Sequence, residues 1–528
     1  MSQQDPTGHM LLAGVPVVGS GPAVRAIDPN TNEELEPLFA HGGAEDVDRA
    51  CARAEEAFAT YRVLDRTTRA AFLEAIADNI EAIGEPLLER ARAETGLPEG
   101  RLSGERGRTT GQLRMFAALL RGGDEQIPRI DPARPDRKPP RADIRQRSVP
   151  LGPVAVFGAS NFPLAFSVAG GDAASALAAG CPVVVKAHDA HPGTSEMVAR
   201  AVAEAVADLG LPAGTFSMLF GSGPGLGAQL VSDRRIRAVG FTGSRAAGLA
   251  LVAAARARPQ PIPVYAEMSS INPVFLLPGA LAERPAELAH GFVGSLTSGA
   301  GQFCTNPGLV LAVDGPQLRT FLDTAASDVA ASEPNAMLTP QIARSYGEDV
   351  AELVAHPATE VIARGSQTPP ANGCRPALLA ADAPNFLADS GLHREVFGAS
   401  SLVVRCRDTA ELRQVADNLE GQLTATVHAS AGDRGEAAQL LAILELRAGR
   451  VLFDGWPTGV EVGQAMVHGG PFPATSDSRA TSVGTGSVER FQRPVAYQDV
   501  PAELLPAEIA AGNPEGLLRR IDGEPGRH

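Results

Sequence analysis

Hydrophobic and polar positions change their spacing several times along the chain, and each spacing predicts a different kind of element. Between residues 11 and 40, apolar residues alternate with turn residues, which predicts short hairpin-like strands. From 44 to 62 the apolar positions recur at helical spacing, and the same pattern predicts helices near 66–91 and 105–120. Amphipathic faces of this kind usually serve a core, so we assign these helices no function.

Continuous apolar runs separated by helical segments follow. Strands are predicted at 154–158, 182–186, 216–220 and 236–241, and helices at 163–180 and 195–209. Apolar strands that alternate with helices are typical of a parallel, doubly wound sheet, whose ligands bind beyond the carboxyl ends of the strands. At those ends the chain has polar or glycine-rich segments: 158–161, 186–189, 221–227 and 242–245. Such groups suit a pyrophosphate, so the pattern predicts a dinucleotide site although GxGxxG is absent.

The rest of the chain predicts a second α/β unit and two less regular segments. Further strands are predicted at 273–277, 309–313, 401–406, 424–428 and 450–453. Residues 501–528 contain several prolines and are predicted to form a surface tail. Residues 123–150 are rich in proline and charge. They are either a solvated linker or an exposed arm whose strand pairs with another subunit.

The composition is that of a globular protein with an acidic balance. The 528 residues are too many for one ordinary core, so two or three domains are expected. With 46 basic and 61 acidic residues the net charge is −15, which disfavours nucleic acids and anionic membranes as partners. Five widely spaced cysteines without a CxxC pair favour a reducing compartment over a disulfide framework or a zinc site. No signal peptide is visible and no apolar run reaches the ~18 residues that span a bilayer, so we expect a cytoplasmic protein.

One cysteine stands out by its neighbours. Cys304 lies among glycines in the segment 298–308, and Asn306-Pro307-Gly308 ends any helix before the apolar run 309–313. The pattern predicts a tight loop that opens into a buried strand. A free cysteine is usually a small buried hydrophobe. From this loop alone, that interpretation and a reactive thiol are equally open.

Six short motifs occur in a fixed order along the chain. They are Phe157-Gly158-Ala159-Ser160-Asn161-Phe162-Pro163, Val185-Lys186, Phe241-Thr242-Gly243-Ser244, Ala266-Glu267, Gly301-Gln302-Phe303-Cys304 and Glu395-Val396-Phe397-Gly398. Together they resemble the NAD(P)-dependent aldehyde dehydrogenase superfamily. A finer resemblance, carried by 186–195, 267–273, 301–308, 421–426 and 466–479, is to the α-ketoglutaric semialdehyde (2,5-dioxovalerate) dehydrogenases. The resemblance implies an α/β fold with a doubly wound, Rossmann-type cofactor domain, an α/β catalytic domain and a small β oligomerisation arm.

The resemblance also implies that Cys304 is a nucleophile. Oxidation of an aldehyde requires a hydride to leave a tetrahedral carbon; a thiolate creates that carbon by adding to the carbonyl, and leaves a thioester that water opens. Partial exposure and polar neighbours are expected to favour the Cys304 thiolate. The Asn161 side chain and the Cys304 backbone N–H would stabilise the oxyanion. Taken alone, Asn161 would instead be interpreted as a helix N-cap.

The matching carboxylate, Glu267, would activate the water that opens the thioester and help to deprotonate the cysteine. A carboxylate in an apolar channel is expected to have a raised pKa, which suits a base working near neutrality. Family members that transfer the acyl group to coenzyme A lack this base, so Glu267 favours hydrolysis. Ser269 and Ser270 replace two glycines common at this point in the superfamily, a departure that the dioxovalerate dehydrogenases share.

The cofactor is expected to be NAD or NADP, and no metal is implied. The residues that match the family's cofactor site are Phe157, Lys186, Gly243, Ser244, Glu395 and Phe397. In the family Lys186 would reach the adenosine ribose, Ser244 the pyrophosphate and Glu395 the nicotinamide ribose. Asp189 stands where NAD-selective members place a carboxylate on the ribose, and Pro224 stands where a phosphate-binding arginine would be sought. The prediction therefore leans towards NAD.

The predicted small-molecule substrate is 2,5-dioxovalerate, oxidised hydrolytically to 2-oxoglutarate. Phe162 and Arg479, with the loop 475–478, are the candidates to hold it, although Arg479 could instead pair with an acid. A broad fatty or aromatic aldehyde dehydrogenase is an alternative, since it shares every catalytic residue. A non-catalytic binding protein of the same fold is a third hypothesis, which the intact Cys304, Glu267 and Asn161 set disfavours.

The family architecture also implies how the chain is divided. Residues 1–132 with 153–265 would form the dinucleotide-binding domain, 266–478 the catalytic domain, 133–152 with 479–500 the bridging strands, and 501–528 a tail. The bridging strand would extend a partner's sheet, so a homodimer or homotetramer is expected. The prolines and charges near this strand fit protection against uncontrolled edge pairing.

Overall fold

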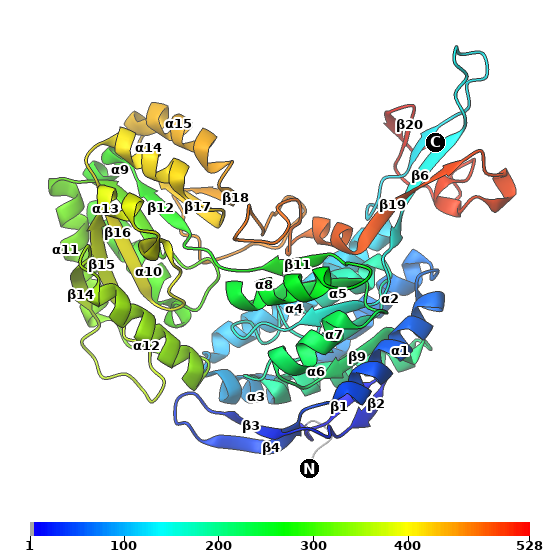
Figure 1. Cartoon of the computed structure of the whole chain (residues 1–528), viewed down its shortest axis with the longest axis horizontal. Coiled ribbons are helices and arrows are strands. Elements are labelled where there is room, and N and C mark those ends of the chain that lie inside the picture. Colours follow the sequence, from blue (N-terminus) through cyan, green and yellow to red (C-terminus); the bar gives the residue numbers. More distant parts are fainter. Residues whose placement is uncertain (1–4, 528) are drawn as a thin grey trace.

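The computed structural model describes residues 5–527. Its strands form two seven-stranded sheets, one five-stranded sheet and one two-stranded hairpin. Each large sheet is the centre of one lobe, and the five-stranded sheet projects from the lobe built on the first sheet (Figure 1). No helix among residues 5–527 has the length and apolar character needed to cross a membrane.

The first large sheet has five parallel strands and two antiparallel strands at one edge. Its order is β11 (Val264–Glu267), β10 (Ala238–Thr242), β7 (Val154–Phe157), β8 (Val183–Lys186), β9 (Phe216–Leu219), β1 (Met10–Leu12) and β2 (Val15–Val17). All four residues of β7, β8 and β9 are buried, because helices cover both faces of the sheet (Figure 1). The parallel, doubly wound sheet predicted from the apolar runs is confirmed. The β1 hairpin joins its edge, and β3 (Ala23–Ile27) pairs separately with β4 (Glu34–Ala40).

Two of the predicted helices differ from the observed ones. The helices of this lobe are α1 (Ala44–Tyr61), α2 (Arg66–Ile83), α3 (Glu85–Thr95), α4 (Glu99–Gly122), α5 (Gly171–Ala179), α6 (Pro192–Asp208), α7 (Ala228–Ser232) and α8 (Arg245–Arg256). The single helix predicted at 66–91 is broken between α2 and α3, because Gly84 has a φ of 71°. The helix predicted at 163–180 begins only at Gly171. Turns occupy 163–170, where the Gly171 N–H donates to the Ala165 carbonyl.

The second large sheet is buried on both faces. Its order is β14 (Glu360–Arg364), β15 (Ala377–Asp382), β16 (Ser400–Cys406), β13 (Leu309–Val313), β12 (Pro273–Leu276), β17 (Gln422–His428) and β18 (Ala448–Phe453), with only β14 antiparallel. Phe275 packs into one apolar cluster while Val274 and Leu276 pack into another. The covering helices are α9 (Pro278–Glu283), α10 (Pro285–Thr297), α11 (Pro316–Ala331), α12 (Pro340–Ala355), α13 (Ala383–Ala388), α14 (Thr409–Asn418) and α15 (Arg434–Leu444).

The five-stranded sheet corrects the prediction for the end of the chain. Its order is β19 (Gln492–Gln498), β6 (Ile144–Pro150), β5 (Arg129–Asp131), β20 (Arg519–Ile521) and β21 (Glu524–Gly526). The residues after 500 were predicted to be a surface tail, but β20 pairs with β5 and the Arg519 side chain is buried. Its guanidinium donates to the carbonyls of Ala507 and Ala510. Pro501 and Pro506 precede two short 3-10 helices, Ala502–Leu504 and Ala507–Ile509, so the prolines shape a folded segment.

The chain passes between the two lobes at one place in each direction. The outgoing strand β11 ends at Glu267, and the returning segment runs antiparallel beside it at Thr475. The Met268 N–H donates to the Ala474 carbonyl at 2.8 Å, and the Ser476 N–H donates to the Ala266 carbonyl at 3.0 Å. Glu267 therefore lies where the two crossings are hydrogen-bonded to each other.

Candidate active site

The loop that carries Cys304 is the tight turn that its glycines predict. After α10 ends, Gly299, Ala300 and Gly301 have φ angles of 54°, 58° and 70°. These are left-handed values that glycine adopts without strain and alanine does not. A side chain on Gly301 would come within 2.3 Å of the backbone of the 398–399 segment. The loop then opens into the buried strand β13, as predicted.

Side-chain amides hold this loop in place. Asn272 Nδ2 donates to the carbonyls of Cys304 and Asn306, at 2.8 and 2.9 Å. Asn306 Nδ2 donates in turn to the Gly398 carbonyl at 3.1 Å. Buried amides therefore fix the Cys304 loop to the segments that precede β12 and β16, the two strands that flank β13.

Ser270 has a structural reason to replace glycine. Its hydroxyl donates to Gln422 Oε1 at 3.0 Å and accepts from the Leu423 N–H at 3.0 Å. Gln422 Oε1 also accepts from the Ile271 and Asn272 N–H groups. The hydroxyl joins β17 to the segment that carries Asn272, so the serine supports the cysteine loop indirectly.

Cys304 lies in contact with two buried side chains that are far away in the sequence. Its Sγ is 3.5 Å from His468 Nε2, and the same nitrogen is 2.9 Å from Glu267 Oε1. The Ser482 hydroxyl donates to Glu267 Oε2 at 2.7 Å. His468 Nδ1 is buried and has no hydrogen-bond partner among residues 5–527. Nε2 therefore meets both the thiol and the carboxylate.

The charges around this cluster correct two predictions about ionisation. Burial opposes the charge on Glu267, but His468 and Ser482 outweigh it and hold the pKa of this carboxyl below its ordinary value. The raised pKa predicted for Glu267 is therefore wrong. Burial and the Glu267 carboxylate raise the pKa of the Cys304 thiol well above its ordinary value. The expectation that the surroundings of the half-buried Cys304 favour a thiolate is also wrong for this state.

Asn161 is not a helix N-cap. It follows β7, and the next helix begins ten residues later at Gly171. Its buried Nδ2 donates to the Gln302 carbonyl at 3.0 Å, two residues before Cys304. The structure thus brings the Asn161 amide against the cysteine loop.

A cavity of about 470 Å³ lies where the carboxyl ends of the first sheet face the second lobe. All the predicted catalytic and cofactor residues except Glu267 line it: Phe157, Asn161, Lys186, Asp189, Gly243, Ser244, Cys304, Glu395 and Phe397. Ser244 caps α8, so a helix N-terminus opens into this cavity. A side chain on Gly243 would come within 2.7 Å of the Phe241 ring, so glycine keeps this wall open. The residues fit an extended phosphate-containing cofactor.

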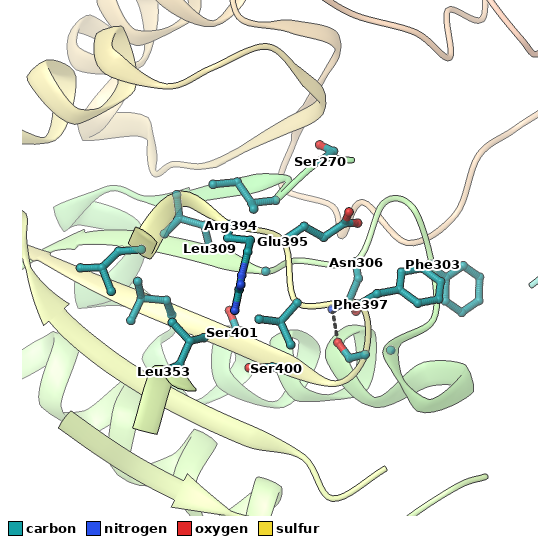
Figure 2. Close-up of a pocket in the computed structure, with 17 residues that line it drawn as sticks. Ser270, Phe303, Asn306, Leu309, Leu353, Arg394, Glu395, Phe397, Ser400 and Ser401 are labelled. Atoms are coloured by element: carbon teal, nitrogen blue, oxygen red, sulfur yellow. Dashed lines mark hydrogen bonds between the residues drawn. The ribbon is translucent and has the colours of Figure 1, made fainter. Parts of the chain in front are cut away.

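The polar groups at the two ends of the cavity differ. Lys186 Nζ is 3.1 Å from Asp189 Oδ1, so the two form an ion pair at the end of β8. At the other end, burial and the negative charge of Glu267 raise the pKa of Glu395 to about 8, although the Ser270 N–H and Arg245 oppose the shift. Figure 2 shows the segment with Glu395 and Phe397 beside the residues Phe303 and Asn306 of the cysteine loop.

The two predicted substrate residues lie in different surroundings. Arg479 is 88% exposed and forms an ion pair with Asp477 at 3.0 Å. The prediction that it binds the substrate is therefore not supported, because the guanidinium faces solvent and already has its acid. Phe162 is half-buried and lies edge-on to Phe303, with 5.7 Å between ring centres. It is therefore next to the cysteine loop.

Sequence reasoning missed His468 and Ser482. His468 lies in the segment 466–479 that carried part of the finer resemblance and Ser482 lies just after it, but neither residue stood out. His468 is 164 positions from Cys304, so only the tertiary fold brings them together. A lone histidine before two glycines carries no signal of such a contact.

One group of metal-ligating side chains coincides with this cluster. The ligand atoms of Glu267, Cys304 and His468 all lie within 4.8 Å of one another. Thiolate, imidazole and carboxylate are zinc ligands. A zinc ion there would occupy the thiol and the carboxylate together and would therefore block them.

The lobes and the cavity between them define the class of fold. The structure superposes on betaine aldehyde dehydrogenase from Staphylococcus aureus in complex with NAD+ with a TM-score of 0.80 at 20% identity, over 94% of this chain and 96% of that one. The aldehyde dehydrogenase family model matches residues 18–471, and the chain belongs to this family. It is 56% identical over 520 residues to alpha-ketoglutaric semialdehyde dehydrogenase 2 of Azospirillum brasilense, covering 98% of this chain and 99% of that protein. It is 47% identical over 518 residues to alpha-ketoglutaric semialdehyde dehydrogenase of Acinetobacter baylyi, covering 98% of each.

Proposed function

We propose that this chain oxidises 2,5-dioxovalerate, which is α-ketoglutaric semialdehyde, to 2-oxoglutarate with NAD(P)+ as oxidant and water as acyl acceptor. Identities of 56% and 47% to proteins named alpha-ketoglutaric semialdehyde dehydrogenase support the substrate. The contact of Cys304 with His468 and Glu267, at the inner end of the cavity, carries the chemistry. A nucleophile, a carboxylate base and an oxyanion donor meet at this point.

The first step is the addition of Cys304 Sγ to the aldehyde carbon. The thiol proton must leave, and the ionised Glu267 carboxylate, which lies within 4.8 Å of Sγ, is placed to accept it. Asn161 Nδ2 already donates one hydrogen to Gln302, and its second hydrogen would donate to the oxyanion. Loss of such a donor typically costs about 10²–10³ in rate.

The cofactor, when bound, supplies the hydride acceptor. Lys186 and the N-terminus of α8 would hold its adenosine and pyrophosphate parts, and Glu395 with Phe397 its nicotinamide half. All of these groups line one cavity. Lys186 lies buried at the end of β8, and Ser244 follows β10 at the N-terminus of α8, positions that support the assignment.

The second step is hydrolysis of the thioester. Glu267 is ionised because its pKa lies below its ordinary value, so it can accept a proton from the attacking water. Ser482 and His468 hold its two oxygens, which fixes the direction of the remaining lone pairs. Water is therefore the acyl acceptor that this arrangement favours.

We propose that NAD is used at least as well as NADP. Asp189 is about half exposed beside Lys186, and its charge would repel a 2′-phosphate. The ratio of kcat/KM for the two cofactors tests this, and a large preference for NADP would contradict it.

We also propose that the chain is divided as its family is, into 1–132 with 153–265, 266–478, and 133–152 with 479–500, and forms a homodimer or homotetramer. Support comes from β6, which pairs with β19 along seven residues on a projecting sheet (Figure 1). β19 is an edge strand of that sheet and is free to extend a second one. Light scattering during gel filtration tests the oligomer, and a monomer at micromolar concentration would contradict it.

A substrate panel tests the function. NADH and NADPH formation would be measured with 2,5-dioxovalerate, succinic semialdehyde, benzaldehyde and a medium-chain aldehyde. We expect 2,5-dioxovalerate to lead in kcat/KM by an order of magnitude or more. If the uncharged aldehydes lead, the oxidation chemistry stands but the proposed substrate does not.

A further inference from the structure

Arg108 is a half-buried arginine without a polar partner. It lies on α4, and its Nε and Nη2 atoms are buried with no hydrogen bond to any residue in 5–527. Its guanidinium instead lies 5.3 Å from the Phe166 ring centre and 5.8 Å from that of Phe162. Arg101, on the same helix, donates to the Asn161 carbonyl at 2.9 Å. The structure therefore satisfies one of these arginines and leaves the other unsatisfied.

Arg108 lies on the side of Cys304 away from the cofactor cavity. The Phe166 ring is 6.4 Å from the His468 ring, and His468 Nε2 is 3.5 Å from Cys304 Sγ. Neither Arg108 nor Phe166 nor His468 lines the cavity that carries the cofactor residues. The contacts run from the thiol through His468 and Phe166 to Arg108, so the guanidinium lies on the His468 side of the cysteine.

A second arginine from the other lobe lies near it. Arg450, on β18, donates to the carbonyls of Gly459 and Pro457 at 2.6 and 2.7 Å, and its Nε is buried without a partner. Burial lowers the pKa of Arg450, and the charge of Arg108 lowers it further, while Cys304 opposes the shift. The charge of Arg108 therefore acts on Arg450 electrostatically.

The acids around this pair do not neutralise it. Glu105, Glu267 and Glu461 act on Arg108 electrostatically, but within residues 5–527 no carboxylate lies within 4.0 Å of either guanidinium. Glu105 is engaged by the Leu164 and Ala165 N–H groups. Glu461 is exposed to solvent. Two neighbouring cations with buried, unsatisfied donors have no counter-ion of their own.

We infer that Arg108, together with Arg450, binds the carboxylate at the end of the substrate remote from the aldehyde. Nε and Nη2 form one edge of a guanidinium, the edge that binds a carboxylate with two parallel hydrogen bonds. A carboxylate there would satisfy both buried donors and reduce the repulsion by Arg450. The inference rests on the proposed function, which places the aldehyde of the same substrate at Cys304. It assigns to Arg108 the role that was predicted for Arg479.

The test compares three variants of the full chain: Arg108→Gln, Arg450→Gln and, as matched control, Arg479→Gln. The kcat/KM values of 2,5-dioxovalerate and succinic semialdehyde would be divided by that of pentanal, which has no carboxylate. We expect this ratio to fall roughly 10²-fold in Arg108→Gln, mainly through KM, because a charge-assisted pair of hydrogen bonds is lost. The control should keep the wild-type ratio.

Binding provides a readout that does not depend on turnover. Glutarate, a dicarboxylate that cannot be oxidised, should raise the Tm of the wild type and of Arg479→Gln but not of Arg108→Gln. Arg108→Lys, which keeps the charge but not the fork, should recover only part of the shift, and it replaces Arg108→Gln if that variant does not fold. If these variants keep the wild-type ratio and Tm shift, or lose activity equally on pentanal, the subsite is wrong. If the wild type itself prefers pentanal, the proposed function fails first.

Discussion

The two sides of Cys304 are built in opposite ways. On the cofactor side, the polar groups follow strand ends and satisfy one another: Lys186 pairs with Asp189, and Ser244 caps α8. On the other side, Arg108, Phe166 and His468 come from separate parts of the chain. Among residues 5–527, two buried nitrogens of Arg108 and one of His468 have no hydrogen-bond partner. The first arrangement serves a ligand common to a whole family. The second arrangement leaves hydrogen-bonding groups that a particular substrate would satisfy.

The pKa values of two carboxyl groups near Cys304 shift in opposite directions. The Glu267 carboxylate is hydrogen-bonded to His468 and Ser482 and its pKa is lowered, whereas the pKa of Glu395 is raised to about 8. Glu267 is buried and Glu395 is half-buried, and burial raises the pKa of each, so hydrogen-bond donors and neighbouring charge decide the direction of each shift. The hydrolytic base is therefore held ionised.

The largest effect is expected from Cys304→Ala. Turnover of every aldehyde should be abolished, since no other thiol lies at the cavity and the remaining four cysteines are buried. NADH binding, measured by fluorescence, should persist because the cofactor groups are untouched. If Cys304→Ala lost NADH binding as well as turnover, the cysteine would also be needed to form the cofactor site.

Glu267→Gln should reduce kcat by about 10²–10⁴, the usual contribution of a general base. We expect hydrolysis of the thioester to depend on Glu267 more strongly than loss of the thiol proton does, so a burst of about one NADH per active site should survive in stopped-flow measurements. Ser482→Ala, which removes only one hydrogen bond to the carboxylate, is the milder control. A variant without a burst would place Glu267 in the acylation step instead.

His468→Leu should shift the acidic limb of the kcat profile to higher pH. The imidazole helps to hold the pKa of Glu267 low, so without it that pKa rises and the base is lost earlier as the pH falls. We therefore expect the kcat of His468→Leu to fall below that of the wild type as the pH is lowered through this limb, and to recover at pH 9. His468→Gln can still donate to Glu267 and should shift less. An unchanged limb in His468→Leu would show that another group sets it.

The smallest effect is expected on the cofactor side. Asp189→Asn removes one charge from a half-exposed ion pair, so kcat/KM for NADP should rise only several-fold relative to NAD. The ratio from initial rates with both cofactors measures it. A fall in the NADP ratio would contradict the assigned repulsion.

The parts of the molecule that sequence predicts best are those that local pattern determines. The strands β7, β8 and β9 were predictable because residues buried on both faces give continuous apolar runs. The break at Gly84 and the strand β20 were missed, because a single glycine in a helical pattern and a proline-rich end are each compatible with several backbones. Tertiary contacts decide between them.

Tertiary contacts also decide which residues lie on the Arg108 side of Cys304. The motifs at Lys186 and Ser244 lie at the ends of predicted strands, whereas Glu395 and Phe397 were located by their motif alone. Arg108 is one of several arginines on α4, and nothing in its spacing differs from that of Arg101 or Arg114. Arg114 is paired with acids on the surface, while Arg108 is not. Whether an arginine is paired depends on side chains from distant segments, which periodicity does not report.

The paired crossings at Glu267 have a mechanical consequence. Only two segments join the lobes there, and they are hydrogen-bonded to each other at Ala266 and Met268. A hinge rotation between the lobes would have its axis near these bonds. Cys304 and Glu395 would then swing against Asn161 and Lys186 as the cleft opens or closes, while Glu267, on the axis, would scarcely move.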